Sequence, residues 1–334
     1  MKLLILTRLY DPHLGGVEKF TLNLVKRFDK KYQVIIITEQ FDTKLKTNDK
    51  IHRHSIYRIP VDYQNERKKK YLIWRWFKNN EELLNWADII HIHDVFFWII
   101  PYKLINRSQN IFLTFYGWEG TYPIPLKNKI VRKISEKMAD GNICVGDFIS
   151  KWYGTKPDIV TYGAVNSPKY KASNSNTLLY TGRLEKDTGF GTAVELYRQL
   201  KNKMQWRLQV AGDGPDKKLA PREANMLGFV PEPEKYIAKA GWVYTTGYLG
   251  IIEAFAYRKL VIASYDNPVK KDYLYMHPMS RNMVIGETST EIADKLSALS
   301  PADTRRMTHE CREWAKRQTW EKLARQHEQL WGLG

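Results

Sequence analysis

The stretch that decides the fold is residues 245–264, TTGYLGIIEAFAYRKLVIAS. The apolar residues Trp242–Tyr244 just before it predict a strand, residues 251–256 predict a short apolar helix, and Leu260–Ser264 predict the next strand. Two glycines separate the first strand from the helix. Such a strand–loop–helix–strand unit receives phosphates in α/β folds, because free backbone N–H groups and the positive end of the helix dipole point at the loop.

One carboxylate within this unit needs an explanation. Glu253 is expected in the first turn of the predicted helix, among apolar residues. There it can accept hydrogen bonds from two adjacent sugar hydroxyls, such as those of a ribose. The alternative is that Glu253 caps its own helix, and the residues alone leave both interpretations open.

Outward from this unit, strands and helices alternate along most of the chain. Short apolar runs are typical of buried parallel strands. The expected strands are residues 3–6, 34–37, 56–59, 88–92, 111–115, 142–145, 178–180, 207–210 and 225–229. This alternation predicts an α/β protein whose parallel sheets are covered by helices on both faces.

A linker divides the alternation into two halves. Residues 163–176, rich in Ser, Asn, Gly and Pro, interrupt it, and 334 residues suit two domains better than one core. We therefore expect two doubly wound Rossmann-like domains, 1–165 and 166–310. A charged helical tail, 311–334, should pack back toward the first domain. Ligands of such domains bind beyond the carboxyl ends of the strands, and two such faces turned toward each other make a cleft.

The composition restricts the setting and the partners. Lys and Arg outnumber Asp and Glu by 53 to 36, so the formal net charge of +17 attracts nucleic acid, anionic membranes or phosphorylated substrates. Cys144 and Cys311 show no metal-site spacing, and a reduced, cytoplasmic setting is the simplest interpretation. Residues 3–6 are too few for a signal-peptide core, and the apolar run 95–100 is too short for a membrane span. We expect a soluble or peripherally attached protein.

Glycine turns follow the first strand of each half. Gly15 and Gly16 do not form a G-x-G-x-x-G fingerprint, but they can bring backbone N–H groups close to a phosphate or a sugar. The alternative is a tight turn without a ligand. In the second half, Gly182 precedes Arg183, which can make a forked contact with a diphosphate, and Lys186 can add charge. Arg183 can also be an ordinary solvated turn residue.

In their order and spacing these residues resemble the retaining nucleotide-sugar glycosyltransferases of family 4, the group 1 glycosyltransferases with the GT-B fold. The resemblance covers nearly the whole chain. In the first half it rests on LILTRLYDPHLGGVEKFTLNLVKRF, ADIIHIHD, LTFYGWEG and ADGNICVGDFISKWY. In the second half it rests on LLYTGRLEKDTGFGTAVEL, VAGDGP, LGFVPEPEKYIAKAGWVY and LGIIEAFAYRKLVIAS. It implies sugar transfer with retention and without a metal or other cofactor, the first domain holding the acceptor and the second the nucleotide-sugar donor.

The resemblance also implies residue roles. The groups that would grip the donor diphosphate are Gly16, Arg183 and the N–H groups around Leu249 and Gly250. Glu253 would hold the ribose, and Phe229 and Val230 would contact the base. Positioned cations and N–H groups that stabilise a leaving diphosphate can take the place of a divalent ion.

The chain departs from the family pattern at three positions. Thr188 replaces the usual lysine that contacts phosphate, Thr245 a glutamate that touches the donor sugar, and Tyr116 a histidine near the reacting sugar. We expect a rewired site, because Lys186 can reach across one turn while Tyr116 and Thr245 can still hydrogen-bond. The candidate catalytic residues are then Arg183, Lys186, Tyr116 and Thr245. The alternative is a fold retained only for binding.

The acceptor side offers weaker candidates. Asp11 and His13 in the first loop can bond an acceptor hydroxyl, and His93 with Asp94 lies at the carboxyl end of a predicted strand. Alternation along that strand puts His91 on the same face as His93, and a structural histidine pair explains the pattern equally well. A third metal ligand at suitable spacing is not evident.

The most unusual local composition is RKKKYLIWRWFK, residues 67–78. As a helix it can lie on an anionic membrane with its aromatic residues down, a geometry that would suit a lipid-linked acceptor. The same mixture suits single-stranded nucleic acid. The third interpretation is a helix with one side in the core and a solvated basic side.

These observations together predict a transferase of hexoses in polysaccharide biosynthesis. The donor would be a UDP- or GDP-sugar, and the acceptor a lipid-linked or envelope glycan at the inner face of the membrane. Two alternatives are a glucosyltransferase that modifies bases in DNA and a catalytically silent, nucleotide-binding partner subunit. The sequence names neither the sugar, the base nor the linkage.

Overall fold

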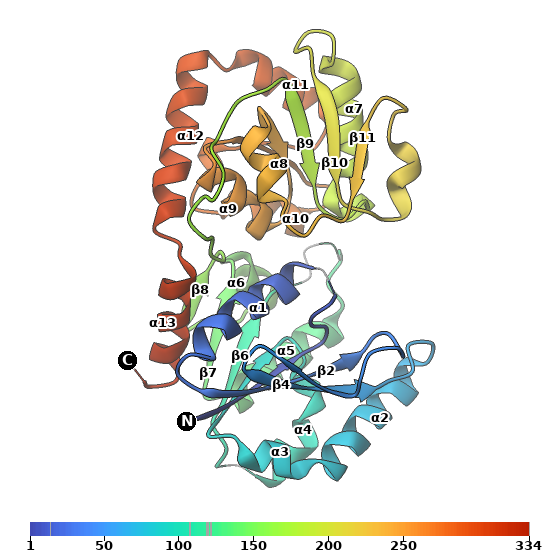
Figure 1. Cartoon of the computed structure of the whole chain (residues 1–334), viewed down its shortest axis with the longest axis vertical. Coiled ribbons are helices and arrows are strands. Elements are labelled where there is room, and N and C mark those ends of the chain that lie inside the picture. Colours follow the sequence, from blue (N-terminus) through green and yellow to red (C-terminus); the bar gives the residue numbers. More distant parts are fainter. Residues whose placement is uncertain (14, 107, 118–119, 121, 334) are drawn as a thin grey trace. The chain divides into compact units, whose positions relative to one another are not determined.

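The computed structural model describes residues 1–13, 15–106, 108–117, 120 and 122–333. The chain forms two compact units (Figure 1). The first comprises Met1–Gly117, Ile124–Thr161 and Trp320–Gly334, and the second comprises Trp118–Pro123 and Tyr162–Thr319. Each unit has its own sheet.

The units divide the chain differently from the expected domains. The second unit starts at Tyr162 rather than at 166, and the chain returns to the first unit at Trp320 rather than at 311. Helix α12 (Pro301–Lys316) therefore belongs to the second unit, where it packs against α9 (Tyr248–Ala256). The expected tail is thus divided, since its residues 311–319 stay with the second unit.

An eight-stranded sheet forms the centre of the first unit. Its strand order is β3-β4-β2-β1-β5-β6-β7-β8, and all neighbours are parallel except β3 with β4. The strands are β1 (Lys2–Thr7), β2 (Gln33–Gln40), β3 (Asn48–Ile51), β4 (His54–Pro60), β5 (Ile89–His93), β6 (Ile111–Phe115), β7 (Gly141–Val145) and β8 (Ile159–Thr161). The apolar runs predicted six of these strands. The polar strand β3 and the three-residue strand β8 were not predicted, because neither is a continuous apolar run.

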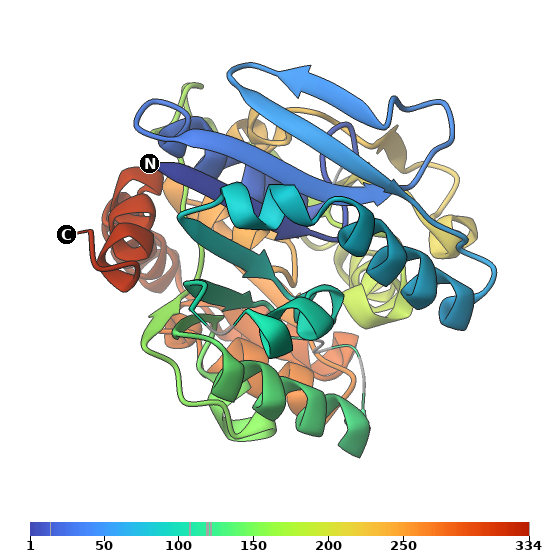
Figure 2. The ribbon, with the colours of Figure 1, turned by 90° about the horizontal axis from the view of Figure 1, so that it is seen from below.

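Helices surround this sheet. They are α1 (Gly16–Phe28), α2 (Glu66–Asn79), α3 (Glu81–Trp86), the 3-10 helix η1 (Phe96–Trp98), α4 (Ile100–Ile105), α5 (Leu126–Met138), α6 (Phe148–Tyr153) and α13 (Trp320–Leu330). Figure 2 shows α2, α3 and α4 on the near side of the strands when the molecule is seen from below. The C-terminal helix α13 packs against α1, and Arg27 pairs with Glu321 at 3.1 Å.

The second unit contains a six-stranded, fully parallel sheet. Its order is β11-β10-β9-β12-β13-β14. The strands are β9 (Thr177–Thr181), β10 (Arg207–Ala211), β11 (Asn225–Gly228), β12 (Trp242–Tyr244), β13 (Leu260–Ser264) and β14 (Val284–Gly286). The remaining helices are η2 (Lys186–Thr188), α7 (Phe190–Leu200), η3 (Pro215–Leu219), α8 (Glu234–Lys239), α10 (Pro268–Tyr275), η4 (Ser280–Asn282) and α11 (Ser289–Ala298).

Both sheets confirm the doubly wound α/β class. The strand order reverses between β1 and β5 in the first unit and between β9 and β12 in the second. Loops at the carboxyl ends of strands on either side of such a reversal are where this architecture binds ligands. Within the described part of the chain, no helix combines the length and the apolar character needed to cross a bilayer.

The decisive stretch folds nearly as predicted, with one correction. Helix α9 begins at Tyr248 with Gly247 as its N-cap, three residues earlier than expected. Glu253 is therefore the sixth helical residue and lies in the second turn, so the first-turn placement was wrong. It cannot cap the helix from there, because capping side chains act on the amides of the first turn.

Candidate functional site

Two glycine loops of the second unit pack directly on each other. The loop after β9 and the loop after β10 are joined because the Gly182 N–H donates to Ala211 O at 3.2 Å. The Leu184 N–H donates to Asp213 O at 3.0 Å. A Cβ on Gly212 would overlap the backbone oxygen of Gly182. These glycines therefore allow the backbone of the loop after β9 to pack directly against the backbone of the loop after β10.

Arg183, the predicted diphosphate clamp, is paired with carboxylates of its own loop. Its guanidinium lies 2.5 Å from Glu185 Oε2 and 3.0 Å from Asp187 Oδ2. The side chain is 57% exposed, so these pairs are accessible to solvent. Lys186, in η2 between the two acids, is also exposed. These two ion pairs were not predicted, although the spacing of the acids, two and four residues after Arg183, is visible in the sequence.

Thr188 stabilises the same loop through hydrogen bonds of its side chain to the loop backbone. Its hydroxyl oxygen lies 2.7 Å from Arg183 O and 2.7 Å from Glu185 O, and it accepts a hydrogen bond from Tyr180 Oη at 3.0 Å. Gly189 follows with a φ of 72°, where a Cβ would overlap the Ser264 hydroxyl. Thr188, at the position where the similar family usually has a lysine, therefore holds the turn.

The N-terminus of α9 meets this loop at the point where the strand order reverses. Thr246 Oγ1 donates to Thr188 O at 3.3 Å. Tyr273 Oη accepts the Tyr248 N–H at 2.8 Å, and the two rings stack at 3.8 Å. The next first-turn amides, of Leu249 and Gly250, have no intrahelical acceptor at that position.

Two further predicted residues lie at this helix. Thr245 is buried, and a Cβ on Gly250 would overlap its hydroxyl, so the two residues are in contact. Glu253 is buried one helical turn after Leu249, on the same side of the helix. The geometry therefore brings Thr245, Gly250 and Glu253 together around the start of α9.

Phe229 and Val230 directly follow β11 at the carboxyl edge of the same sheet. The Gly212 N–H donates to Gly228 O at 2.8 Å, which ties the end of β11 to the glycine loops. Phe229 is 55% exposed, unusual for a phenylalanine. The expected strand 225–229 ends one residue early, at Gly228.

In the first unit, a carboxylate lies against the first residue of the glycine pair. A Cβ on Gly15 would overlap the carboxylate of Glu18, whose Oε1 is 3.0 Å from His13 Nδ1. An acid in the first turn of α1 is favourable to the helix dipole. A Cβ on Gly16 would meet open space, while the backbone oxygen of Asp11 accepts from the buried Arg58 at 3.1 Å. Glu18 is a residue that sequence reasoning missed.

His93, Asp94 and Tyr116 form a connected group at the ends of β5 and β6. His93 Nδ1 hydrogen-bonds to Tyr116 Oη at 2.7 Å, and Asp94 Oδ2 accepts the Tyr116 N–H at 3.1 Å. Burial lowers the pKa of His93 to about 3 and raises the pKa of Tyr116 well above its usual value. Both rings are therefore neutral near pH 7. Arg132 Nη2 lies 3.5 Å from the other oxygen of Asp94.

His91 has a structural role. It accepts from Trp331 Nε1 at 3.0 Å and hydrogen-bonds to Thr114 Oγ1 at 2.8 Å, both through buried atoms. His327 of α13 packs beside it with ring centroids 5.0 Å apart. Burial lowers the pKa of His91 and lowers that of His327 to about 4. Three neutral imidazoles thus line the interior here, and among the described residues no group of three or more His, Cys, Asp or Glu side chains could hold a metal ion.

The segment 67–78 lies wholly within helix α2, as the membrane-surface and the core-facing interpretations both expected. Asn65 caps α2 by accepting from the Arg67 and Lys68 N–H groups at 3.1 and 3.0 Å. Lys69 is buried and pairs with the buried Glu39 at 2.9 Å, so it is not one of the solvent-facing cations expected of this segment. Trp74 donates its indole N–H to Phe97 O at 2.8 Å.

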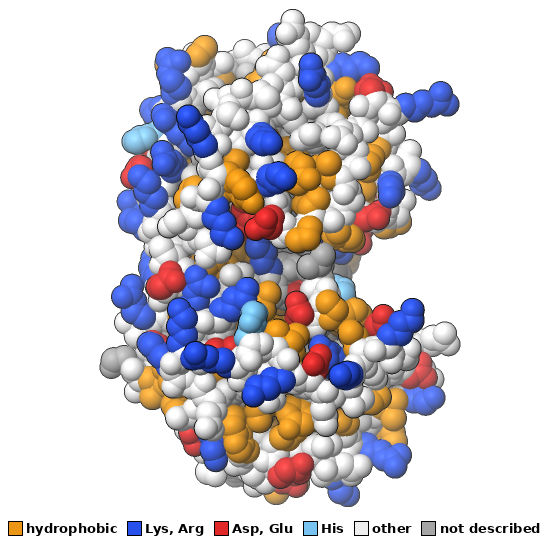
Figure 3. All heavy atoms as spheres, in the orientation of Figure 1, with side chains coloured by type: hydrophobic (Ala, Val, Ile, Leu, Met, Phe, Trp, Pro, Cys, Tyr) orange, Lys and Arg blue, Asp and Glu red, His pale blue; other side chains and the backbone are white. Residues whose placement is uncertain are grey.

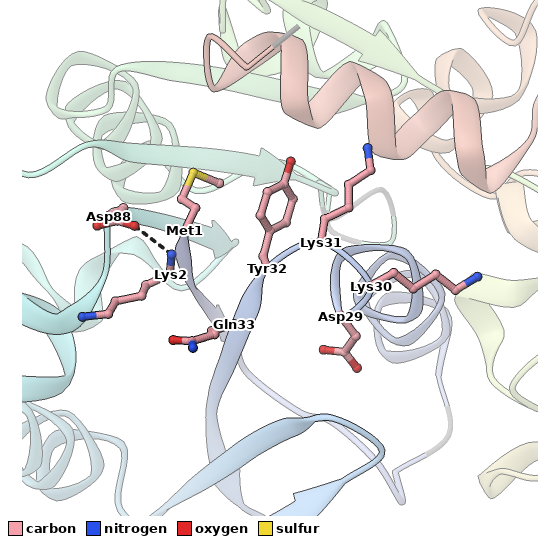
Figure 4. Close-up of a pocket in the computed structure, with 8 residues that line it drawn as sticks. All are labelled: Met1, Lys2, Asp29, Lys30, Lys31, Tyr32, Gln33 and Asp88. Atoms are coloured by element: carbon pink, nitrogen blue, oxygen red, sulfur yellow. Dashed lines mark hydrogen bonds between the residues drawn. The ribbon is translucent and has the colours of Figure 1, made fainter.

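A cavity of about 510 Å³ lies at the other end of the first sheet (Figure 4). It is lined by Met1, Lys2, Asp29, Lys30, Lys31, Tyr32, Gln33 and Asp88. Lys2 and Gln33 begin β1 and β2, so the cavity lies at the amino ends of these strands. None of the predicted site residues lines it, and ligands of this architecture bind at the carboxyl ends.

Known proteins share the fold, and a family model matches part of the first unit. No curated protein matches the chain. The family described as Glycosyltransferase Family 4 matches residues 14–157. Sucrose-phosphate synthase from Thermosynechococcus elongatus has a TM-score of 0.77 at 15% identity, covering 99% of this chain and 98% of that chain. Anabaena HepE in complex with UDP-glucose has a TM-score of 0.73 at 16% identity, covering 100% of both chains.

A third structure, that of WaaG, is described as a glycosyltransferase involved in lipopolysaccharide biosynthesis. It has a TM-score of 0.67 at 14% identity and covers 96% of this chain and 98% of that chain. At these identities the structures establish the fold alone. The chain has the GT-B fold that the sequence motifs predicted, and its residues 14–157 match the model of Glycosyltransferase Family 4.

Proposed function

We propose that this protein transfers a sugar from a nucleotide diphosphate donor to a glycan hydroxyl, with retention of the anomeric configuration and without a metal cofactor. The observation that carries the proposal is the junction of two loops in the second unit. Thr246 joins the loop that carries Arg183 to the start of α9, where amides without an intrahelical acceptor lie one helical turn from the buried carboxylate of Glu253. A cation, helix amides and an acid for a ribose are the groups that a nucleotide diphosphate requires.

UDP is the nucleotide we propose first. Anabaena HepE, which shares the fold, is solved in complex with UDP-glucose. In this chain, Glu253 would accept from the ribose hydroxyls, and the exposed ring of Phe229 would contact the base together with Val230. A GDP-sugar remains the second donor to test, because the described contacts do not discriminate between bases.

Stabilisation of the leaving diphosphate would be the main catalytic contribution. Breaking the bond between the sugar and the diphosphate leaves negative charge on the phosphate oxygens, and positioned donors lower the barrier where that charge develops. Arg183 and the amides of Leu249 and Gly250 would supply these donors. Lys186 would replace the missing lysine, since Thr188 is committed to bracing the loop.

The first unit would supply the acceptor side. The neutral pair of His93 and Tyr116, with Asp94, would line the position next to the reacting sugar, and Asp11 and His13 would contact the acceptor hydroxyl. We propose a lipid-linked or envelope glycan as the acceptor, at the inner face of a membrane. WaaG, another protein with this fold, is described as acting in lipopolysaccharide biosynthesis. DNA modification has no specific contact in its favour.

A second candidate function is a silent subunit that binds a nucleotide without transferring a sugar. Two observations favour it. Arg183 is already paired with Glu185 and Asp187, and the Glu18 carboxylate lies against Gly15 at the start of the first helix. Both arrangements must change before a diphosphate can bind in the predicted way.

Nucleotide binding followed by turnover tests the proposal. Thermal unfolding with UDP, GDP or ADP should show a rise for one of them, since a ligand at one hundred times its Kd stabilises by about 2.7 kcal/mol. Glu253→Gln should abolish that rise. Incubation with UDP-glucose should then release UDP, measured by chromatography. Binding without release would favour the silent subunit, and the absence of binding by all three nucleotides would refute both functions.

A further inference from the structure

Arg132 is set apart from the surface cations of this protein. Figure 3 shows Lys and Arg side chains spread over the visible face of both units. The side chain of Arg132, on α5, is only 10% exposed. Its guanidinium carbon lies 4.5 Å from the ring centroid of Phe115 and 4.3 Å from that of Tyr153. Because Phe115 ends β6, this cation lies at the carboxyl edge of the first sheet.

The buried guanidinium has one carboxylate partner. Removing a charge from water is costly, and the two aromatic faces compensate only part of that cost. Arg132 Nη2 lies 3.5 Å from Asp94 Oδ1, while its Nη1 is buried and has no hydrogen-bond partner in the described part of the chain. A buried ion pair contributes little net stability on average. The role of this pair must therefore be sought in what Asp94 holds.

Asp94 has an unusual backbone conformation. Its φ is 58°, in the left-handed region, which aspartate tolerates better than most residues but still adopts at a cost. Backbone strain of this kind gathers at functional sites and persists only where surrounding contacts hold it. The Asp94 N–H donates to Thr114 O at 3.1 Å, and Arg132 holds the carboxylate from the other side. Both contacts fix the direction in which this carboxylate points.

The Asp94 carboxylate holds the backbone of Tyr116. Its Oδ2 accepts the Tyr116 N–H at 3.1 Å, directly after the end of β6. Gly117 follows with a φ of 79°, where a Cβ would overlap the ring of Phe148. The Tyr116 hydroxyl bonds to His93 at 2.7 Å. A buried cation and a strained aspartate, both costly, thus act on one candidate catalytic residue.

We propose that Arg132 is a positioning residue, which acts through Asp94 to fix the backbone of Tyr116 and thereby the place of its hydroxyl. Neither Arg132 nor Asp94 touches the substrate in this arrangement. The place of the hydroxyl beside a reacting sugar rests on the proposed function, whereas the hold of Arg132 on Tyr116 does not. Such a hold matters because a displacement of about 1 Å near the reacting atoms can lower a rate by roughly a hundredfold.

Hydrogen–deuterium exchange resolved to single amides, together with kinetics, tests the proposal. Arg132→Met removes the charge and keeps an apolar side chain between the rings. The Tyr116 amide should then exchange about tenfold faster, because its acceptor is no longer held. In UDP release from UDP-glucose, kcat should fall roughly ten- to hundredfold and KM should stay within about twofold, since the second unit grips the donor. Arg132→Lys restores the charge and should recover part of kcat.

Two controls separate positioning from general stability. Lys137→Met removes an exposed cation from the same helix and should change neither measurement. Asp140 is the sharper control, because its Oδ2 accepts the Ile111 N–H at 2.7 Å at the opposite end of β6. Asp94→Gly, which tolerates the positive φ, and Asp140→Ala should each speed exchange at the amide they release. Only Asp94→Gly should lower kcat. If Arg132→Met does not fold, Arg132→Lys and Asp94→Gly carry the comparison.

Two results would overturn the positioning role. Unchanged exchange of the Tyr116 amide in Arg132→Met would show that the cation does not hold this backbone. Faster exchange with an unchanged kcat, or an equal fall of kcat in Asp140→Ala, would assign the ion pair to the stability of the sheet alone. A wild-type protein that binds UDP but releases none from UDP-glucose would refute the proposed function instead, and the exchange comparison would still decide whether Arg132 holds Tyr116.

Discussion

The carboxyl edges of the two sheets differ in how their polar groups are used. In the second unit, Arg183 is exposed and the first-turn amides of α9 have no intrahelical acceptors. In the first unit, His93 is buried and Tyr116 is half-buried, and the two neutral rings are bonded to each other. At one edge, an exposed cation and helix amides are accessible to a ligand. At the other edge, the polar side chains of His93 and Tyr116 satisfy each other.

The largest expected difference between the units is their response to acid. The folded-state pKa values of His93 and His327 are about 3 and 4, and that of His91 is also lowered, all below the value of about 6.5 for an unfolded histidine. The unfolded chain therefore binds more protons below pH 6.5. The stability from keeping these rings neutral is present above pH 6.5 and is lost as the pH falls toward 3–4. The second unit buries one such ring, His277, with a pKa of about 3.

Each such histidine lowers the unfolding free energy by up to about 1.4 kcal/mol per pH unit in this window. Between pH 6.5 and pH 5.5 the first unit should therefore lose roughly three times as much stability as the second. Limited proteolysis at both pH values, with the cleavage sites mapped to each unit, measures this. Earlier cleavage of the second unit at pH 5.5 would contradict the comparison.

The next largest effect concerns the touching glycine loops of the second unit. A Cβ at Gly212 would overlap backbone of Gly182, which has no flexible side chain to move, so Gly212→Ala should cost roughly 3 kcal/mol or more. Gly228→Ala is the matched control, since Gly228 also has a positive φ, of 66°, but faces open space. It should cost about 1–2 kcal/mol. Urea unfolding measures both, and equal losses would show that the contact of the loops is not the cause.

The sequence predicted the sheets better than the sites, for a physical reason. A buried parallel strand is a continuous apolar run, so strands such as β5 and β13 can be recognised locally. The start of α9 cannot, because Tyr248 is held there by Tyr273, 25 residues away. In the same way, the role of Thr188 depends on Tyr180 from the preceding strand.

Burial was the property least accessible from the sequence. The four-residue spacing of Leu126, Ile130 and Ile134 is the normal signature of a core-facing stripe, yet it faces outward. Lys69 stands in a basic run and is buried against Glu39. A periodic pattern gives the face of a helix, but which face meets the sheet depends on the packing of the neighbouring elements.

Removing the guanidinium of Arg183 should weaken donor binding more than it lowers the free energy of unfolding. Arg183→Ala should weaken UDP binding by roughly ten- to hundredfold, about 1.4–2.7 kcal/mol, because a charge-assisted contact to the diphosphate is lost. Its exposed ion pairs within the loop contribute little to folding. Arg198→Ala, on α7 of the same unit, is the control and should leave affinity unchanged. Titration calorimetry measures both, and equal affinities would remove Arg183 from the donor site.

The smallest expected effect has the opposite sign. Glu185 and Asp187 compete with a diphosphate for Arg183, so Glu185→Gln and Asp187→Asn should each raise UDP affinity by a few-fold, within the 1 kcal/mol typical of exposed ion pairs. Glutamine keeps the oxygen that caps η2, so the loop should stay folded. Glu223→Gln, which breaks a comparable pair with Lys201 elsewhere in the unit, should have no effect. Weaker UDP binding by the first two variants would mean that these acids orient Arg183 for the donor, so the pairing seen in the second unit would be a preformed clamp.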